Sequence, residues 1–90
     1  MVQQYEWVVI GLQLNEAVKE RLCQLLKQKG MTQYQLFRKT GLPKSTISNI
    51  ANCNYQSMHL RVIHELCQGL GMSLGEFFAS PLFDESNLEP

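Results

Sequence analysis

Five polar side chains between Lys44 and Asn52 would share one face of a helix. At 100° of rotation per residue they fall within an arc of about 140°, away from the apolar residues of the same stretch. They are Lys44, Ser45, Ser48, Asn49 and Asn52. Only Lys44 is charged, whereas a helix that merely faces solvent usually carries more Glu and Lys. Short hydrogen-bonding groups of this kind can pair with base edges of DNA, Asn with adenine and Lys with guanine.

Two short helices joined by a tight turn are predicted to present this face. Thr32, followed three residues later by Gln35, is a capping box that predicts the start of one helix, and Gly41 ends it in a left-handed conformation. Pro43 suits the first position of the next helix, where its missing N–H costs nothing. The pattern predicts a helix-turn-helix from about Thr32 to Asn52, with its second helix, which begins at Pro43, in the major groove.

Caps and apolar periodicity predict three more helices around this unit. The first runs from an N-cap at Asn15 to Gly30, another from a cap at Ser57 to Gly71, and a short one begins at a second capping box, Ser73 with Glu76. The sequence thus predicts an all-α, five-helix domain. The residues expected to face inward on these three helices are Val18, Leu22, Leu25, Leu26, Leu60, Ile63, Leu66, Cys67, Leu70, Leu74, Phe77 and Phe78.

Charge is balanced overall but segregated along the chain. The net charge is zero, yet residues 21–64 contain seven Lys or Arg and no Asp or Glu, and all eight acidic residues lie outside that block. A basic block of this kind is typical of a polyanion-binding surface, although a merely solvated face would look similar.

Neither a catalytic nor a metal site emerges from the sequence. Cys23, Cys53 and Cys67 cannot all pair within one chain, no CxxC motif is present, and His59 and His64 lack ligand spacing to the cysteines. We therefore expect no enzyme activity, no cofactor and no metal. No apolar run reaches the roughly 18–20 residues of a membrane span, and no basic residue precedes the first apolar stretch as in a secretory signal. A cytoplasmic protein without membrane contact is expected.

The two ends of the chain fall outside the helical pattern. We divide it into an extension (1–14), a helix-turn-helix DNA-binding domain (15–78) and an acidic, loosely held tail (79–90). Residues 4–12 are rich in β-branched and aromatic residues and resemble a strand, but the chain offers no second strong strand to pair with. This segment is expected either to pair with the same segment of a second copy as a dimerisation arm, or to form a helical extension on the domain's own core.

Three separated segments resemble the Cro/cI-type (XRE) helix-turn-helix family of phage and bacterial repressors. They are Thr32–Leu36 (TQYQL), Gly41–Ile50 (GLPKSTISNI) and Leu66–Phe78 (LCQGLGMSLGEFF), which follow in order at the family's spacing. The resemblance covers about residues 15–78. It implies a five-helix, lambda-repressor-like fold that binds operator DNA, usually as a homodimer.

The resemblance also implies roles for individual residues. Gln33 stands where a Gln of the family contacts the phosphate backbone and braces the recognition helix. The positions that read bases correspond to Lys44, Ser45 and Asn49. The residues expected to make phosphate or secondary contacts, besides Gln33, are Thr32, Thr46, Ser48 and Asn52.

The sequence departs from the family pattern at four positions. Phe37 replaces a small residue, Ala51 an acidic one, Cys53 a Gly, and Gln56 a Pro. The first change is expected to alter the crossing angle of the two helices or to help fill the core. Because Gly is missing at position 53, Asn52 or Asn54 is expected to take the left-handed conformation.

These observations predict sequence-specific binding of a palindromic double-stranded DNA operator by a homodimer, and transcriptional regulation by repression. A protein-interaction module is the alternative, for example an antitoxin-like partner that holds another protein through residues 4–12 or the C-terminal tail around Leu82 and Phe83. The basic block favours the first function, whereas the neutral net charge and the apolar start leave room for the second.

Overall fold

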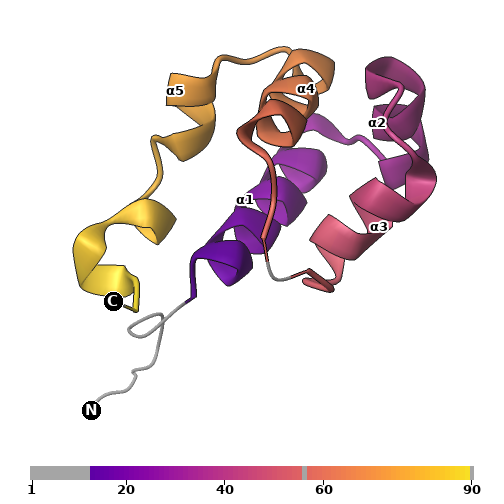
Figure 1. Cartoon of the computed structure of the whole chain (residues 1–90). Coiled ribbons are helices and arrows are strands. Elements are labelled where there is room, and N and C mark those ends of the chain that lie inside the picture. Colours follow the sequence, from indigo (N-terminus) through magenta and orange to yellow (C-terminus); the bar gives the residue numbers. More distant parts are fainter. Residues whose placement is uncertain (1–12, 56, 90) are drawn as a thin grey trace.

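Five α-helices form the described part of this computed structural model, which comprises residues 13–55 and 57–89 (Figure 1). No strand longer than an isolated bridge occurs within these residues. This confirms the prediction of an all-α, five-helix domain. The helices are α1 (Leu14–Lys29), α2 (Gln33–Thr40), α3 (Lys44–Ala51), α4 (Leu60–Leu70) and α5 (Leu74–Phe78), followed by two 3₁₀ turns, η1 (Pro81–Phe83) and η2 (Glu85–Asn87).

Local capping chemistry sets several of these helix ends. Thr32 and Gln35 form the predicted capping box, with N···O distances of 3.1 and 2.9 Å. Ser73 and Glu76 form the second one, and the hydrogen bonds from Ser73 lower the pKa of the Glu76 carboxyl. Helices α1, α2 and α4 end on glycines with positive φ, as predicted; these are Gly30, Gly41 and Gly71.

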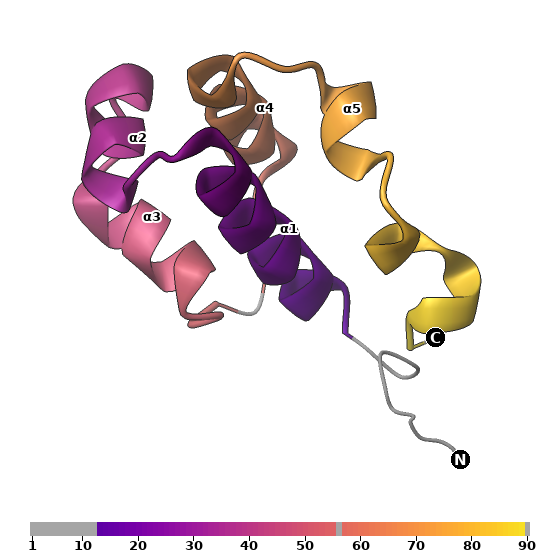
Figure 2. The same cartoon turned by 180° about the vertical axis from the view of Figure 1, so that it is seen from behind.

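One apolar core joins all five helices. Its largest fully buried side chains are Phe77, Leu22, Leu36, Ile47, Leu66 and Cys67. Helix α1 lies against α3 and α2 lies against α4, so α1 and α4 together support the helix pair α2–α3 (Figures 1 and 2). Most residues predicted to face inward do so, from Val18 on α1 to Phe77 on α5.

Two predicted N-caps are wrong by two residues. Helix α1 begins one residue before Asn15, with Gln13 as its N-cap, and the Gln13 N–H donates to Glu16 Oε1 at 3.0 Å. Helix α4 begins at Leu60, after His59 rather than Ser57. The expectation that Leu60 and Leu74 face inward is also wrong. Leu60 stands on the outer side of the first turn of α4 and is 75% exposed, and Leu74 at the start of α5 is 38% exposed.

The C-terminal segment is not loosely held. The ring of Phe83 lies 4.8 Å from that of Phe78 and 6.2 Å from that of Phe77, measured between centroids, and η1 rests on α1. Asn87 Nδ2 donates to the Pro81 carbonyl, and Ser80 Oγ accepts from the Leu82 N–H. The expectation of a loose tail is therefore wrong for residues 81–89, because the aromatic cluster gives that segment apolar surface to bury.

The predicted N-terminal arm, residues 4–12, lies outside the described residues. Among the described helices, none is long and apolar enough to cross a membrane. Cys23, Cys53 and Cys67 are all free thiols, and Cys67 is a core residue whose pKa is raised by burial. It therefore packs as a small hydrophobic residue.

Helix α4 packs closely against α2 at Gly69, and this contact generates a stability prediction. A methyl group added there would overlap Thr40 Cγ2 and lie 3.1 Å from Leu36 Cδ1. Thr40 cannot rotate away freely, because its Oγ1 accepts the Leu42 N–H that closes the turn to α3. We expect Gly69→Ala to lower the free energy of unfolding by about 1–3 kcal/mol, despite the better helix propensity of Ala.

Gly75→Ala on α5 is the matched control, because the nearest atom to its added methyl group is Ser73 Oγ at 3.8 Å. This variant should gain about 0.5–1 kcal/mol. Urea unfolding of both variants measures the difference. Equal effects of the two substitutions would show that the α2–α4 contact is not tight.

Candidate nucleic-acid interface

The turn between α2 and α3 holds the two helices as one unit. Gly41 has φ 75°, and its N–H donates to the Phe37 carbonyl at 3.0 Å. Leu42 follows and is only 8% exposed, so the turn is anchored in the core. Pro43 is the N-cap of α3 rather than its first helical residue, one position from the prediction. The geometry is that of a helix-turn-helix.

Helix α3 presents the predicted polar face to solvent. Its other side is buried in the core through Ile47, Ile50 and Ala51. The three predicted base-reading residues, Lys44, Ser45 and Asn49, are exposed, as is Asn52, while Thr46 and Ser48 are half-buried. Asn52 Nδ2 donates to Ser48 Oγ at 3.3 Å, so these two side chains form one hydrogen-bonded pair along the face.

Helix α2 brings Gln33 to the same surface. A shallow apolar pocket of about 190 Å³ lies between the two helices, and Gln33 lines it together with Lys44 and Ser48. Thr32 is exposed, but its hydroxyl oxygen already accepts the Gln35 N–H. Gln33 therefore has the freer side chain of the two for contact with a ligand on this surface.

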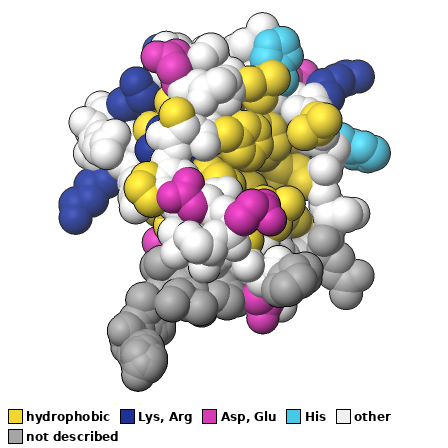
Figure 3. Space-filling model, turned by 90° about the vertical axis from the view of Figure 1, so that its left-hand side faces the viewer, with side chains coloured by type: hydrophobic (Ala, Val, Ile, Leu, Met, Phe, Trp, Pro, Cys, Tyr) yellow, Lys and Arg dark blue, Asp and Glu magenta, His cyan; other side chains and the backbone are white. Residues whose placement is uncertain are grey.

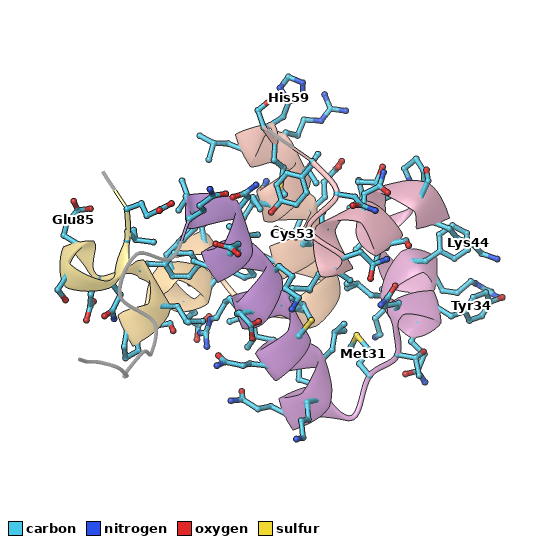
Figure 4. All side chains as sticks on the ribbon, turned by 90° about the horizontal axis from the view of Figure 1, so that it is seen from below. Met31, Tyr34, Lys44, Cys53, His59 and Glu85 are labelled. Atoms are coloured by element: carbon cyan, nitrogen blue, oxygen red, sulfur yellow. The ribbon has the colours of Figure 1, made fainter. Side chains whose placement is uncertain are left out.

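The ammonium group of Lys44 lies against two aromatic rings of α2. Its Nζ is 5.2 Å from the ring centroid of Tyr34 and 5.3 Å from that of Phe37, within range of a cation–π interaction. Figure 4 shows Lys44 and Tyr34 side by side at the α2–α3 end of the molecule. Arg38 joins them, since its Nη1 donates to Tyr34 Oη at 3.3 Å.

Sequence reasoning missed Tyr34 and Arg38, and for Phe37 it predicted an altered crossing angle or core filling but no contact with Lys44. The i, i+4 spacing of Tyr34 and Arg38 was a signal that the two side chains meet on one helix face. Their approach to Lys44 depends on the angle between α2 and α3, which no local pattern encodes. Together they form a cationic and aromatic edge next to the polar face of α3.

The end of α3 is fastened to α1. Cys53 itself adopts the left-handed conformation, with φ 58°, so the expectation that Asn52 or Asn54 does so is wrong. The Asn54 N–H donates to the Asn49 carbonyl at 2.7 Å, which supports this strained position.

The loop after α3 is bound to α1 by two hydrogen bonds. Tyr55 Oη donates to the Asn15 carbonyl at 2.9 Å, and Asn15 Nδ2 donates to the Tyr55 carbonyl at 3.0 Å.

The basic residues of α2 and α3 make no salt bridge among the described residues. The two ion pairs found there are Lys19–Glu20 on α1 and Arg61–Glu65 on α4. Arg38, Lys39 and Lys44 therefore keep their charge available to an external anion. The described residues also hold no group of three or more His, Cys, Asp or Glu side chains that could bind a metal ion.

Comparison with models of known protein families identifies the family of this chain. The family model described as "Cro/C1-type HTH DNA-binding domain" matches residues 21–80. The chain belongs to the Cro/C1-type helix-turn-helix family. It therefore carries a DNA-binding domain of that family, which is one of DNA-binding regulators rather than of enzymes. A search of curated protein sequences found no match.

Solved structures of similar fold include regulators of restriction–modification systems. The wild-type restriction-modification controller protein C.Esp1396I is 29% identical, with a TM-score of 0.66 over 72% of this chain and 83% of that one. The same protein as a tetramer with its natural 35-base-pair operator gives the same identity and TM-score over 72% and 84%. Prophage Lp1 protein 11 is 27% identical, with a TM-score of 0.71 over 81% of this chain and 96% of that one.

The bond between Tyr55 and Asn15 generates a pH prediction. Burial, with a smaller contribution from the nearby Cys53 thiol, raises the pKa of Tyr55 from its ordinary value of 10 to about 12. The folded state thus keeps the phenol proton that the unfolded state loses, so this contribution to stability is complete below pH 10 and is lost as the pH rises to about 12.

We expect wild-type stability to fall more steeply across this pH interval than the stability of Tyr55→Phe, measured by urea unfolding. At neutral pH, Tyr55→Phe should be less stable by about 0.5–1.5 kcal/mol, because the Asn15 carbonyl loses its donor. Parallel pH profiles for the two proteins would contradict this account of Tyr55.

Proposed function

We propose that this protein binds a specific double-stranded DNA operator through the exposed face of α3 and represses transcription there. The observation that carries the proposal is the set of exposed donors and acceptors on α3 beside cations that lack acidic partners among the described residues. Such a face fits the major groove, where each base pair presents a distinct pattern of donors and acceptors. Membership of the Cro/C1-type family supports the same function.

Two kinds of contact are proposed within this interface. Lys44, Ser45 and Asn49 read bases, since they are exposed on the part of α3 that points away from the core. Phosphate and secondary contacts come from the flanking polar residues, which fix the position of the domain on the duplex. These are Thr32, Gln33, Thr46, Ser48 and Asn52.

The rings of Tyr34 and Phe37 give Lys44 a defined starting position. An ammonium group held over aromatic faces loses less side-chain entropy when it engages a base or a phosphate. Lys44 therefore combines a full charge with a limited set of directions, which suits a residue that discriminates between bases.

We further propose that two copies bind together to a palindromic operator. One α3 has only eight residues, and its exposed face reaches few base pairs. Two such helices, about one DNA turn of roughly 34 Å apart, would read two half-sites. The solved tetramer of C.Esp1396I on its natural operator supports assembly on DNA for a similar domain.

A binding-site selection from random duplexes tests the whole proposal. We expect an enriched palindromic motif, and an affinity that decreases as the salt concentration rises, because cations of the protein displace counterions from phosphates. Sedimentation of the complex should give two chains per selected site. Absence of an enriched motif would refute sequence-specific binding.

Substitutions on α3 test the assignment of the reading residues. Asn49→Ala and Ser45→Ala should each cost about 1–3 kcal/mol at the selected site and relax the base preference at one position. Gln24→Ala is the matched control, an exposed polar residue on α1 beside the C-terminal segment, and it should bind as wild type. Normal affinity and preference in the α3 variants would show that another face reads the DNA.

A further inference from the structure

An apolar groove of about 220 Å³ lies between the starts of α1 and α4 and the end of α5. Its apolar lining comes from Leu14, Val18, Met58, Leu60, Ile63 and Phe78. Figure 3 shows hydrophobic side chains gathered in one patch on the side of the molecule that carries α5 and the C-terminal segment. The groove shares no lining residue with the polar face of α3, so DNA binding does not explain it.

Two leucines on the rim of this groove are unusually exposed. Leu60 is 75% exposed and Leu14 is 59% exposed, more than any other large hydrophobic side chain among the described residues. Single exposed apolar residues are ordinary, but two that flank one apolar hollow indicate a surface that something covers. Leu60 fits the apolar periodicity of its helix, although it is exposed. A segment that covers the groove would bury it and so account for a leucine at this position.

The beginning of the chain has the composition and the position to cover the groove. Residues 5–10 read Tyr-Glu-Trp-Val-Val-Ile, and the chain reaches Leu14, itself a groove residue, after only three more residues. Gly11 in that link can take any turn conformation. A run of six extended residues spans about 20 Å, enough to follow the groove from α1 towards α4.

We propose that residues 5–10 lie in this groove of their own chain, with Trp7 packed beside Leu60. Attachment in the same chain favours this over a second copy, because a short tether keeps the segment at an effective concentration on the order of millimolar. No association entropy is then lost. In this arrangement the segment extends the apolar core of its own domain. It does not serve as a dimerisation arm that pairs with the same segment of a second copy.

Trp7 is the only tryptophan in the chain, so its fluorescence reports directly on this contact. In the full-length protein we expect blue-shifted emission and weak quenching by acrylamide, both unchanged on dilution through the range in which sedimentation shows monomers. Leu60→Gln should shift the emission to the red and raise the quenching. Its helical circular dichroism should stay that of wild type, because Leu60 is exposed in the described domain.

Leu74→Gln is the matched control, since Leu74 is also an exposed leucine at a helix start but does not line the groove. It should leave the Trp7 emission unchanged. Solvent-like emission in wild type, or equal spectra for wild type and Leu60→Gln, would overturn the proposal. So would burial of Trp7 that disappears on dilution together with a halved mass, because the segment would then serve a second copy.

Discussion

The close packing of α2 against α4 at Gly69 constrains where helix α3 lies. Because Gly69 has no side chain, Leu36 and Thr40 of α2 can come within contact distance of the α4 backbone. Thr40 then accepts the Leu42 N–H and so fixes the turn that leads into α3. The orientation of α3 therefore follows from a packing contact on the opposite side of α2.

Elements specified by neighbouring residues could be predicted from the sequence, and elements specified by tertiary contacts could not. Two kinds of helix end depend only on residues three or four apart, and the sequence predicts both correctly. They are the capping boxes at Thr32 and Ser73 and the helix ends at glycine. Asn15 resembles an N-cap by type, but its side chain bonds to the Tyr55 carbonyl, forty residues away. Cys53 takes the left-handed conformation because hydrogen bonds from both sides of it close the end of α3.

In the candidate interface, too, features of a single helix could be predicted from the sequence, whereas contacts between helices could not. The polar arc of α3 is a property of one helix, and 100° periodicity was enough to place Lys44, Ser45 and Asn49 on its exposed side. The contact of Lys44 with Tyr34 and Phe37 joins two helices across the turn. A large residue at position 37, unusual for the family pattern, thus lies under the Lys44 ammonium group as well as against the core. Only the relative placement of α2 and α3 shows this second role.

Charge counting along the chain overstates the cationic surface that DNA could meet. Arg21 belongs to the basic block, but its guanidinium donates to the Phe77 and Glu76 carbonyls at 2.6 and 2.7 Å and caps the end of α5. Arg61 is paired with Glu65 on α4. The cations that the structure places together at the α2–α3 edge are Arg38 and Lys44, both beside the ring of Tyr34. The non-specific electrostatic part of DNA affinity grows with the number of phosphates that Lys and Arg side chains neutralise. Because few cations lie at this surface, that part of the affinity should be modest for one domain. In the proposed function, selectivity therefore rests on the hydrogen-bonding groups of α3 and on the pairing of two copies, and neither requires a positive net charge.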